Sequence, residues 1–237
     1  MVTRPVPLGT GIYSRAEAAR LLGVTPSRLR RWVSGYSYWS RYWDEPEHRR
    51  RPPVIETDLP VIDDAVALSF FELMELRVVK GLVDRGLSLQ SVRRAAALCS
   101  REFQTRHPFA SRRVYTDGNR VYAALSREDV PEVIELTERR RLQVILGQVV
   151  QPFLQEIDFD ESTLLAYRWW PMGRSVPVVL DPRIAFGSPV LEGTAIRTSV
   201  AARTAATEPP EHVAEAYQVD LSRIEAAVEF EAQLAAA

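Results

Sequence analysis

Residues 14–34 predict two short helices joined by a tight turn, and this pair constrains the fold more than any other feature of the sequence. The run SRAE from Ser14 to Glu17 has the form of a capping box, in which the serine caps a helix and the glutamate returns a hydrogen bond. Gly23 fits the end of that helix, because glycine adopts a left-handed conformation without strain. Thr25 and Pro26 open the second helix as its cap and first helical residue.

The second predicted helix has one apolar face and one polar face. Leu29, Trp32 and Val33 face inward at helical spacing. The outward positions carry serine and arginine, namely Ser27, Arg28, Arg30 and Arg31. A DNA-reading helix needs a buried face that fixes its angle and outward Ser, Thr or Arg side chains that reach phosphates and base edges. The pattern favours a DNA-reading helix pair; an ordinary helical hairpin is the alternative.

The charge is divided unevenly along the 237 residues, although the formal net charge is −1. Residues 1–120 contain 20 Lys and Arg against 13 Asp and Glu, a balance of +7. Residues 121–237 contain 10 against 18, a balance of −8. This asymmetry indicates that the first half faces a polyanion and that the second half faces another partner.

An aromatic and basic stretch follows the helix pair and ends at the proline pair of residues 52–53. It predicts a loop or wing rather than regular core structure. We expect Trp32, Trp39 and Trp43 to be packing residues rather than residues that stack on bases. The run Arg49–Arg51 has two interpretations, a grip on phosphates or a solvated charge run, and the second is the more common.

Residues 69–103 predict two further helices. Ser69 and Glu72 form a second capping box before an apolar run with helical spacing. Ser88 caps the next helix, whose apolar face carries Cys99. A lone cysteine on such a face is expected to be a core thiol, and it excludes an internal disulfide and indicates a reducing compartment.

The middle of the chain changes character. Residues 112–125 contain two Val/Tyr-rich runs around Asp117-Gly118-Asn119, which predicts a β-hairpin. An amphipathic helix is expected from about Thr137, with a kink at Pro152. The acidic run 156–162 predicts a linker, and 164–171 and 176–181 predict strands. The tail predicts three helices, over about 198–206, 209–217 and 220–234.

Candidate chemical groups are scattered, and we do not expect an enzyme. His48, His107 and His212 have no metal-ligand spacing, so neither a metal nor a cofactor is expected. Asp158, Asp160 and Glu161 fit a flexible acidic linker better than a catalytic carboxylate cluster. The N-terminal run lacks the apolar core of a signal peptide, and no stretch approaches the roughly 18 apolar residues of a membrane helix. These features predict a cytoplasmic protein with no membrane partner.

Residues 12–100 resemble the winged helix-turn-helix DNA-binding domain of the MerR family. The resemblance rests on the runs IYSRAEAARLLGVTPSRLRRW and LRVVKGLVDRGLSLQSVRRA and on the wing-like stretch between them. In that family the second helix enters the major groove and the wing contacts the DNA backbone. The resemblance therefore implies second-helix contacts by Thr25, Ser27, Arg28, Arg30 and Arg31. It also implies wing or phosphate contacts by Tyr36, Tyr38 and Arg41. The long coiled coil of MerR proteins does not follow, so a metal-responsive activator is not expected.

Residues 176–234 resemble the DUF433 family, which is associated with VapB-type antitoxins. The resemblance rests on Asp181-Pro182, on the Gly187-x-Pro189 step, on Gly193-Thr194 and on the closing run EAAVEFE. It implies a strand and turn leading into a small three-helix unit, and a VapC-type ribonuclease toxin as partner. The run YRWWPMGR at 167–174 suits a toxin-covering surface; equally, one of Trp169 and Trp170 lies in the core and the other on the surface of a strand.

Together these features predict a mainly α fold with small β elements. The expected domains are a MerR-like winged helix-turn-helix domain over 1–104, a hairpin and connecting helix over 105–162, and a DUF433-like antitoxin or dimerisation domain over 163–237. We expect a homodimeric antitoxin of a type II VapBC system, which neutralises a PIN-type ribonuclease and binds operator DNA to regulate its own gene. The alternatives are a stand-alone MerR-like regulator that senses a small molecule around 105–160, and a protein–protein adaptor that never touches DNA.

Overall fold

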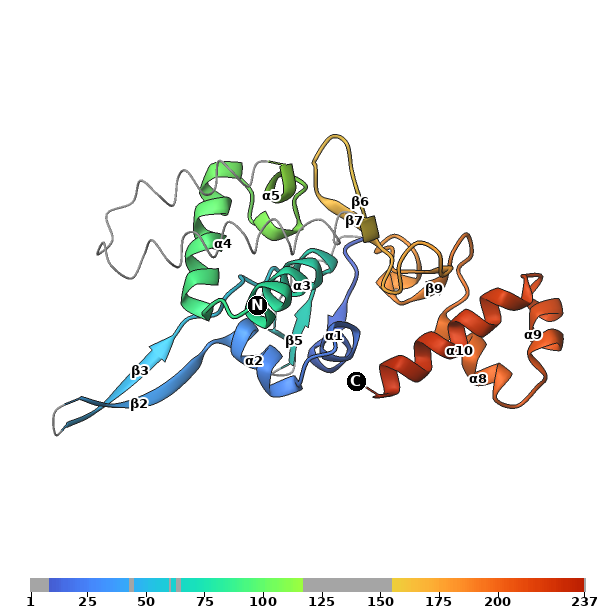
Figure 1. Ribbon diagram of the computed structural model, residues 1–237, viewed down its shortest axis with the longest axis horizontal. Helices are drawn as coiled ribbons and strands as arrows, with labels where there is room; N and C mark the ends of the chain where they lie inside the picture. The colour runs from blue at the N-terminus through green and yellow to red at the C-terminus, as the bar shows by residue number, and fades with distance from the viewer. Residues whose placement is uncertain (1–8, 43–44, 60, 63–64, 117–154, 237) are drawn as a thin grey trace.

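The computed structural model describes residues 9–42, 45–59, 61–62, 65–116 and 155–236. The fold of this part of the chain is mainly helical with small antiparallel strand pairs (Figure 1). Its first half contains β1 (Tyr13–Ser14), α1 (Arg15–Leu22), α2 (Pro26–Ser34), β2 (Tyr36–Tyr42), β3 (Glu45–Arg51), β4 (Val61–Ile62), β5 (Ala65–Leu68), α3 (Phe70–Asp84), α4 (Leu89–Phe103), η1 (Pro108–Ala110) and α5 (Arg113–Thr116). Its second half contains β6 (Ile157–Phe159), β7 (Ala166–Trp169), β8 (Val178–Val179), η2 (Ala185–Gly187), β9 (Val190–Leu191), α8 (Thr198–Ala205), α9 (Pro210–Tyr217) and α10 (Leu221–Ala236).

The predicted capping residues Ser14, Thr25, Ser69 and Ser88 are confirmed as helix N-caps. The Ser14 hydroxyl accepts a hydrogen bond from the Glu17 amide, and the Thr25 hydroxyl accepts one from the Arg28 amide. α1 ends at Gly23, whose φ of 58° is left-handed. Both halves of the capping box at the start of α3 form, and Ser88 caps α4. Because these hydrogen bonds join residues only three positions apart, the first residue of each of these helices could be predicted from the sequence.

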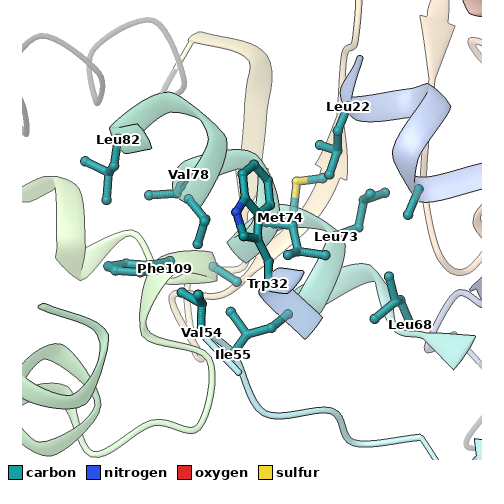
Figure 2. Close-up of a cluster of buried hydrophobic side chains, with 14 of the residues drawn as sticks. Leu22, Trp32, Val54, Ile55, Leu68, Leu73, Met74, Val78, Leu82 and Phe109 are labelled. Atoms are coloured by element: carbon teal, nitrogen blue, oxygen red, sulfur yellow. The ribbon is translucent and has the colours of Figure 1, made fainter. Parts of the chain in front are cut away.

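α3 is the centre of the largest apolar core, and α2 packs onto it through Trp32. The Trp32 side chain is 1% exposed. Figure 2 shows it in the middle of a cluster that includes Met74 and Val78 of α3 and Val54 and Ile55 of the segment after β3. The Val54 amide also donates a hydrogen bond of 2.7 Å to the Trp32 carbonyl oxygen. α2 is therefore held at a fixed angle, with its opposite face turned outward.

The segment after α2 is a regular hairpin, not a loop. β2 and β3 pair antiparallel from Tyr36 opposite Arg51 to Tyr42 opposite Glu45, and the hairpin extends away from the helical body (Figure 1). The packing role expected for Trp39 is wrong, because its side chain is 68% exposed. Trp39 lies on the two-stranded arm and is not part of the main apolar core. Trp43 lies outside the described residues.

The hairpin predicted over 112–125 is wrong in its first strand. Residues Arg113–Thr116 form the helix α5, and η1 precedes it. Phe109, Ala110 and Val114 are buried in the core with α3 and α4, and this packing overrides the β preference of the Val/Tyr run. The rest of that hairpin, from residue 117, and the helix expected from about Thr137, as far as residue 154, lie outside the described residues. That helix is expected to reach Ile157, which instead begins β6.

The acidic run 156–162 is not a linker. β6 pairs antiparallel with β7, and Ile157 is buried in the main core. Asp158 pairs with Arg174 at 2.6 Å, and Asp160 accepts hydrogen bonds from the amides of Ser162 and Thr163, which closes the turn between the strands. The acidic side chains are therefore fixed by structure that their composition did not reveal.

The expected strands around 164–171 and 176–181 are confirmed as β7 and β8, although both are shorter than those runs. The placement of one tryptophan on the surface is wrong, because Trp169 and Trp170 are 3% and 5% exposed. Trp169 joins the main core, and Trp170 packs with Val179 and Val190 in a separate cluster. Neither ring is available to cover a partner.

The three tail helices are confirmed as α8, α9 and α10, and they enclose a small core of their own. This C-terminal part also contacts the rest of the chain. Leu21 of α1 packs against the cluster of Ala226 and Phe230 on α10. The main core runs from Tyr13 to Leu180, so it crosses both boundaries expected between domains, at 104 and at 162.

Candidate nucleic-acid interface

The outer face of α2 presents short polar and basic side chains. Thr25, Ser27, Arg30 and Arg31 are exposed, whereas Leu29 is buried. Thr25 and Ser27 stand at the N-terminal end of the helix, where backbone N–H groups favour anions such as phosphates. The helix therefore has the side-chain chemistry of a recognition helix on the face that it does not use for packing.

Arg28 differs from the other residues predicted on this face. Its guanidinium donates a 2.6 Å hydrogen bond to Asp84 at the end of α3, and Lys80 pairs with the same carboxylate at 2.8 Å. The Arg28 Cζ also lies 4.9 Å from the centroid of the Trp32 ring. The two cations lower the pKa of Asp84, although its partial burial opposes them. Arg28 thus ties α2 to α3 in this structure.

The hairpin carries one stacked face and one exposed face. On the first, Arg31 of α2 lies 4.4 Å from the centroid of Tyr36, and the Arg51 guanidinium donates to the Tyr38 hydroxyl at 3.2 Å. On the second, Ser37, Trp39 and Arg50 are exposed, and Ser37 lies directly opposite Arg50 in the strand register. Tyr36 and Tyr38 are therefore half-buried supports for arginines. Arg41 lies in β2, and its side chain is outside the described part.

The base of the hairpin is fixed to α4. The Arg93 guanidinium donates to the carbonyl oxygens of Pro52 and Pro53 at 2.9 and 3.3 Å. Together with the Arg31–Tyr36 contact, this fixes the direction in which the arm leaves the body. α2 lies at the base of the arm (Figure 1), and both present arginine on exposed positions.

The sequence did not reveal an ionic cluster at α3 whose innermost members are buried. His107 contacts two carboxylates, with its Nε2 2.6 Å from Asp58 and its Nδ1 3.2 Å from Glu75. Glu75 is 2% exposed and Glu72 is fully buried, with the Asp58 amide and the Ser69 amide donating to Glu72. The available signal was two glutamates three residues apart inside the apolar run of α3; the partners come from distant segments.

The environment of His107 raises the pKa of its imidazole. Burial lowers the pKa, but hydrogen bonding to Glu75 and the charges of Glu75 and Asp58 outweigh that effect. The folded state therefore favours protonated His107 more than the unfolded state does. Its stabilising contribution is complete below the unfolded value of about 6.5 and is lost as the pH rises through the raised folded pKa.

This shift predicts a pH dependence of stability. The free energy of unfolding is expected to fall as the pH rises above about 6.5 and through the raised folded pKa of His107. Urea denaturation at pH 6, 7.5 and 9 measures the change. The His107→Gln variant cannot gain that proton, so its stability is expected to vary less over the same interval. An equal pH dependence in both proteins would contradict the assignment.

The remaining candidate groups do not form a reactive site in the described residues. Within those residues, no group of three or more His, Cys, Asp and Glu side chains is arranged to hold a metal ion. Cys99 is 2% exposed, and burial raises its thiol pKa to about 12, which confirms the expected core thiol. The described helices include none long and apolar enough to cross a membrane.

Comparison with known proteins supports an antitoxin-like relationship for this chain. The family model "Protein of unknown function (DUF433)" matches residues 178–230. A protein of Mycobacterium tuberculosis (strain ATCC 25618 / H37Rv) named "Putative antitoxin VapB45" is 29% identical over 194 residues, which span 79% of this chain and 80% of the relative. The crystal structure of Rv2018 from Mycobacterium tuberculosis matches with a TM-score of 0.69 and 25% identity, over 96% of this chain and 100% of that chain. Neither the family description nor the relative's name states an enzymatic activity, in agreement with the expectation of a non-enzymatic protein.

Proposed function

We propose that this chain is the antitoxin of a type II, VapBC-like toxin–antitoxin system, which binds a PIN-type ribonuclease and also binds operator DNA. The similarity to a protein named as a VapB antitoxin over most of both chains supports the toxin-binding half. The match of the DUF433 family model to residues 178–230 also supports toxin binding, because it lies in the part of the chain where the sequence predicts partner binding. In this proposal residues 163–237 bind the toxin or pair two subunits, and residues 1–104 bind DNA.

The observation that carries the DNA-binding half is the exposed face of α2 beside the anchored hairpin. Thr25, Ser27, Arg30 and Arg31 form a recognition surface, while Arg28 holds the helix on α3 through Asp84. The hairpin acts as a wing whose exposed arginines meet the phosphate backbone. A homodimer would place two such helices about 34 Å apart, or a multiple of this distance, and would read a pseudo-palindromic operator.

Loss of the exposed α2 arginines is expected to weaken DNA binding. The double variant Arg30→Ala, Arg31→Ala should bind the DNA upstream of its own gene about 10- to 100-fold less tightly than wild type. Each lost phosphate contact should also reduce the slope of log K against log salt by about 0.9. Fluorescence anisotropy with a labelled upstream fragment, at several salt concentrations, measures both quantities.

The matched control removes two charges elsewhere. Arg197 and Arg203, at the start and within α8, are also exposed, so Arg197→Ala, Arg203→Ala changes the net charge by the same amount. This control is expected to keep wild-type affinity and salt slope. Equal loss in the two double variants would mean a general charge effect, and full affinity in the α2 variant would refute the recognition-helix assignment.

Toxin binding is tested by co-expression with the product of the adjacent gene, with the mass of the complex read by size-exclusion chromatography and light scattering. A stable complex in which the ribonuclease no longer cleaves RNA is the expected result. A homodimer without affinity for the neighbour, but with affinity for upstream DNA, would leave a stand-alone regulator. A chain that binds neither would contradict both halves of the proposal.

A further inference from the structure

The loop at residues 181–187 holds three successive residues in left-handed conformations. The φ angles are 48° for Ala185, 57° for Phe186 and 84° for Gly187. This region favours glycine, and a bulky side chain such as phenylalanine occupies it with strain. Strained positions of this kind persist where the surroundings fix them, and they cluster at functional sites.

Neighbouring residues fix this loop on both sides. The Ile12 amide donates a 3.1 Å hydrogen bond to the Phe186 carbonyl oxygen, and the buried Tyr13 hydroxyl donates one of 2.8 Å to the Gly187 carbonyl oxygen. Within the loop, the Gly187 amide donates to the Ile184 carbonyl oxygen at 2.9 Å. The backbone of Phe186 is thus held in place by its own peptide groups rather than by its ring.

The Phe186 ring contributes little to the folded state. It is 63% exposed, and Ile12, whose backbone is hydrogen-bonded to it, is 45% exposed. Glycine at position 186 would satisfy the same backbone hydrogen bonds without strain and without an exposed ring. Folding alone therefore gives no reason for a phenylalanine here, whereas an apolar anchor that enters a partner's pocket does.

We propose that Phe186 and Ile12 form the apolar centre of the surface that docks the toxin. Arg183 lies beside this centre with 57% of its side chain exposed, while Asp181, with which it pairs, is fully buried. Arg183 therefore presents a guanidinium at the edge of this centre. The surface fits a protein with an apolar pocket and carboxylates at its edge. This inference rests on the toxin-binding half of the proposed function, and it names the residues that carry that binding.

The test uses Phe186→Gly in the full-length chain and the purified, catalytically inactive product of the adjacent ribonuclease gene as probe. Isothermal titration calorimetry is expected to show a Kd raised about tenfold or more, because an anchor side chain is lost. Thermal unfolding of the free variant is expected at or above the wild-type temperature, because the left-handed strain is removed. A ring needed for folding would lower that temperature instead.

Two further variants separate a specific contact from a general loss of apolar surface. Phe186→Leu keeps an apolar side chain and is expected to bind within about threefold of wild type. Trp39 on the β2–β3 arm is also exposed and lies outside residues 163–237, and Trp39→Ala is expected to leave the Kd for the toxin unchanged.

The outcomes distinguish the docking surface from the function on which it rests. If the wild type binds the toxin and Phe186→Gly binds it equally well, the docking surface is refuted but the antitoxin proposal stands. Failure of the wild type to bind the probe refutes both. A third outcome is that the wild type self-associates, with Phe186→Gly abolishing this association and leaving the affinity for the toxin unchanged. That result would assign the surface to a second copy of the chain and overturn the inference.

Discussion

Replacing His107 with alanine is expected to lower the free energy of unfolding by about 3–5 kcal/mol, since the variant leaves the buried carboxylate of Glu75 without its cationic partner. His107 lies 2.6 Å from Asp58 and 3.2 Å from Glu75, and Glu75 is 2% exposed. The Phe109 amide also donates to Glu75, at 3.4 Å, but a neutral donor does not balance a buried charge. Urea denaturation at pH 7, with wild type in parallel, measures the loss.

A compensating substitution tests the cause. In the double variant His107→Ala, Glu75→Gln the buried side chain is neutral, so part of the lost stability is expected to return. The double variant should lose less unfolding free energy than the sum of the losses measured for the two single variants. Strict additivity would show that the cost of His107→Ala comes from lost packing rather than from an unpaired charge.

Gly187→Ala is expected to have the second large effect. The added Cβ atom should lower the free energy of unfolding by about 3 kcal/mol. The φ of 84° strains any L-residue by about 1–2 kcal/mol. The added Cβ would also overlap the Tyr13 hydroxyl oxygen and lie 3.2 Å from the Gly11 Cα, so the buried Tyr13–Gly187 hydrogen bond would have to shift. Thermal and chemical denaturation of Gly187→Ala measure the sum.

The chain offers a matched control for the strain alone. Gly173 has a φ of 80°, but a Cβ there meets no atom within 4 Å. Gly173→Ala is therefore expected to lose only the strain component. Tyr13→Phe removes the overlapping oxygen, so Gly187→Ala should cost less in the Tyr13→Phe background than in wild type. If Gly187→Ala and Gly173→Ala are equally destabilising, the Tyr13 contact carries no weight.

The parts of the fold that the sequence predicted depend on short-range signals. The starts of α1, α2, α3 and α4 follow from side chains that cap a backbone amide three residues away. The outer face of α2 follows from helical periodicity, which also placed Leu29 and Trp32 in the core. Such signals need no knowledge of what the segment packs against.

The parts that failed depend on distant partners. Arg113–Thr116 became a helix because Phe109 and Val114 pack against α3 and α4. The acidic run became a strand because β7 pairs with it, and Asp158 meets Arg174. Arg28 looked like its neighbours on α2, and only the fold brings Asp84, 56 residues away, to its guanidinium. The His107 cluster could not be predicted for the same reason, because Glu75 and Asp58 are 32 and 49 residues away from His107 in the sequence.

The continuous core bears on how this protein can be recombined with others. Phe109, Ile157, Trp169 and Leu180 share one apolar cluster with α3, so a cut at residue 104 would leave apolar surface of α3 and α4 in water. A chimaera that joins residues 1–104 to a foreign C-terminal half should therefore fold poorly. The transferable unit reaches at least Leu180. A lineage that exchanged its C-terminal helices would have had to do so beyond that point, with β6 and β7 kept in the unit that carries α2 and α3.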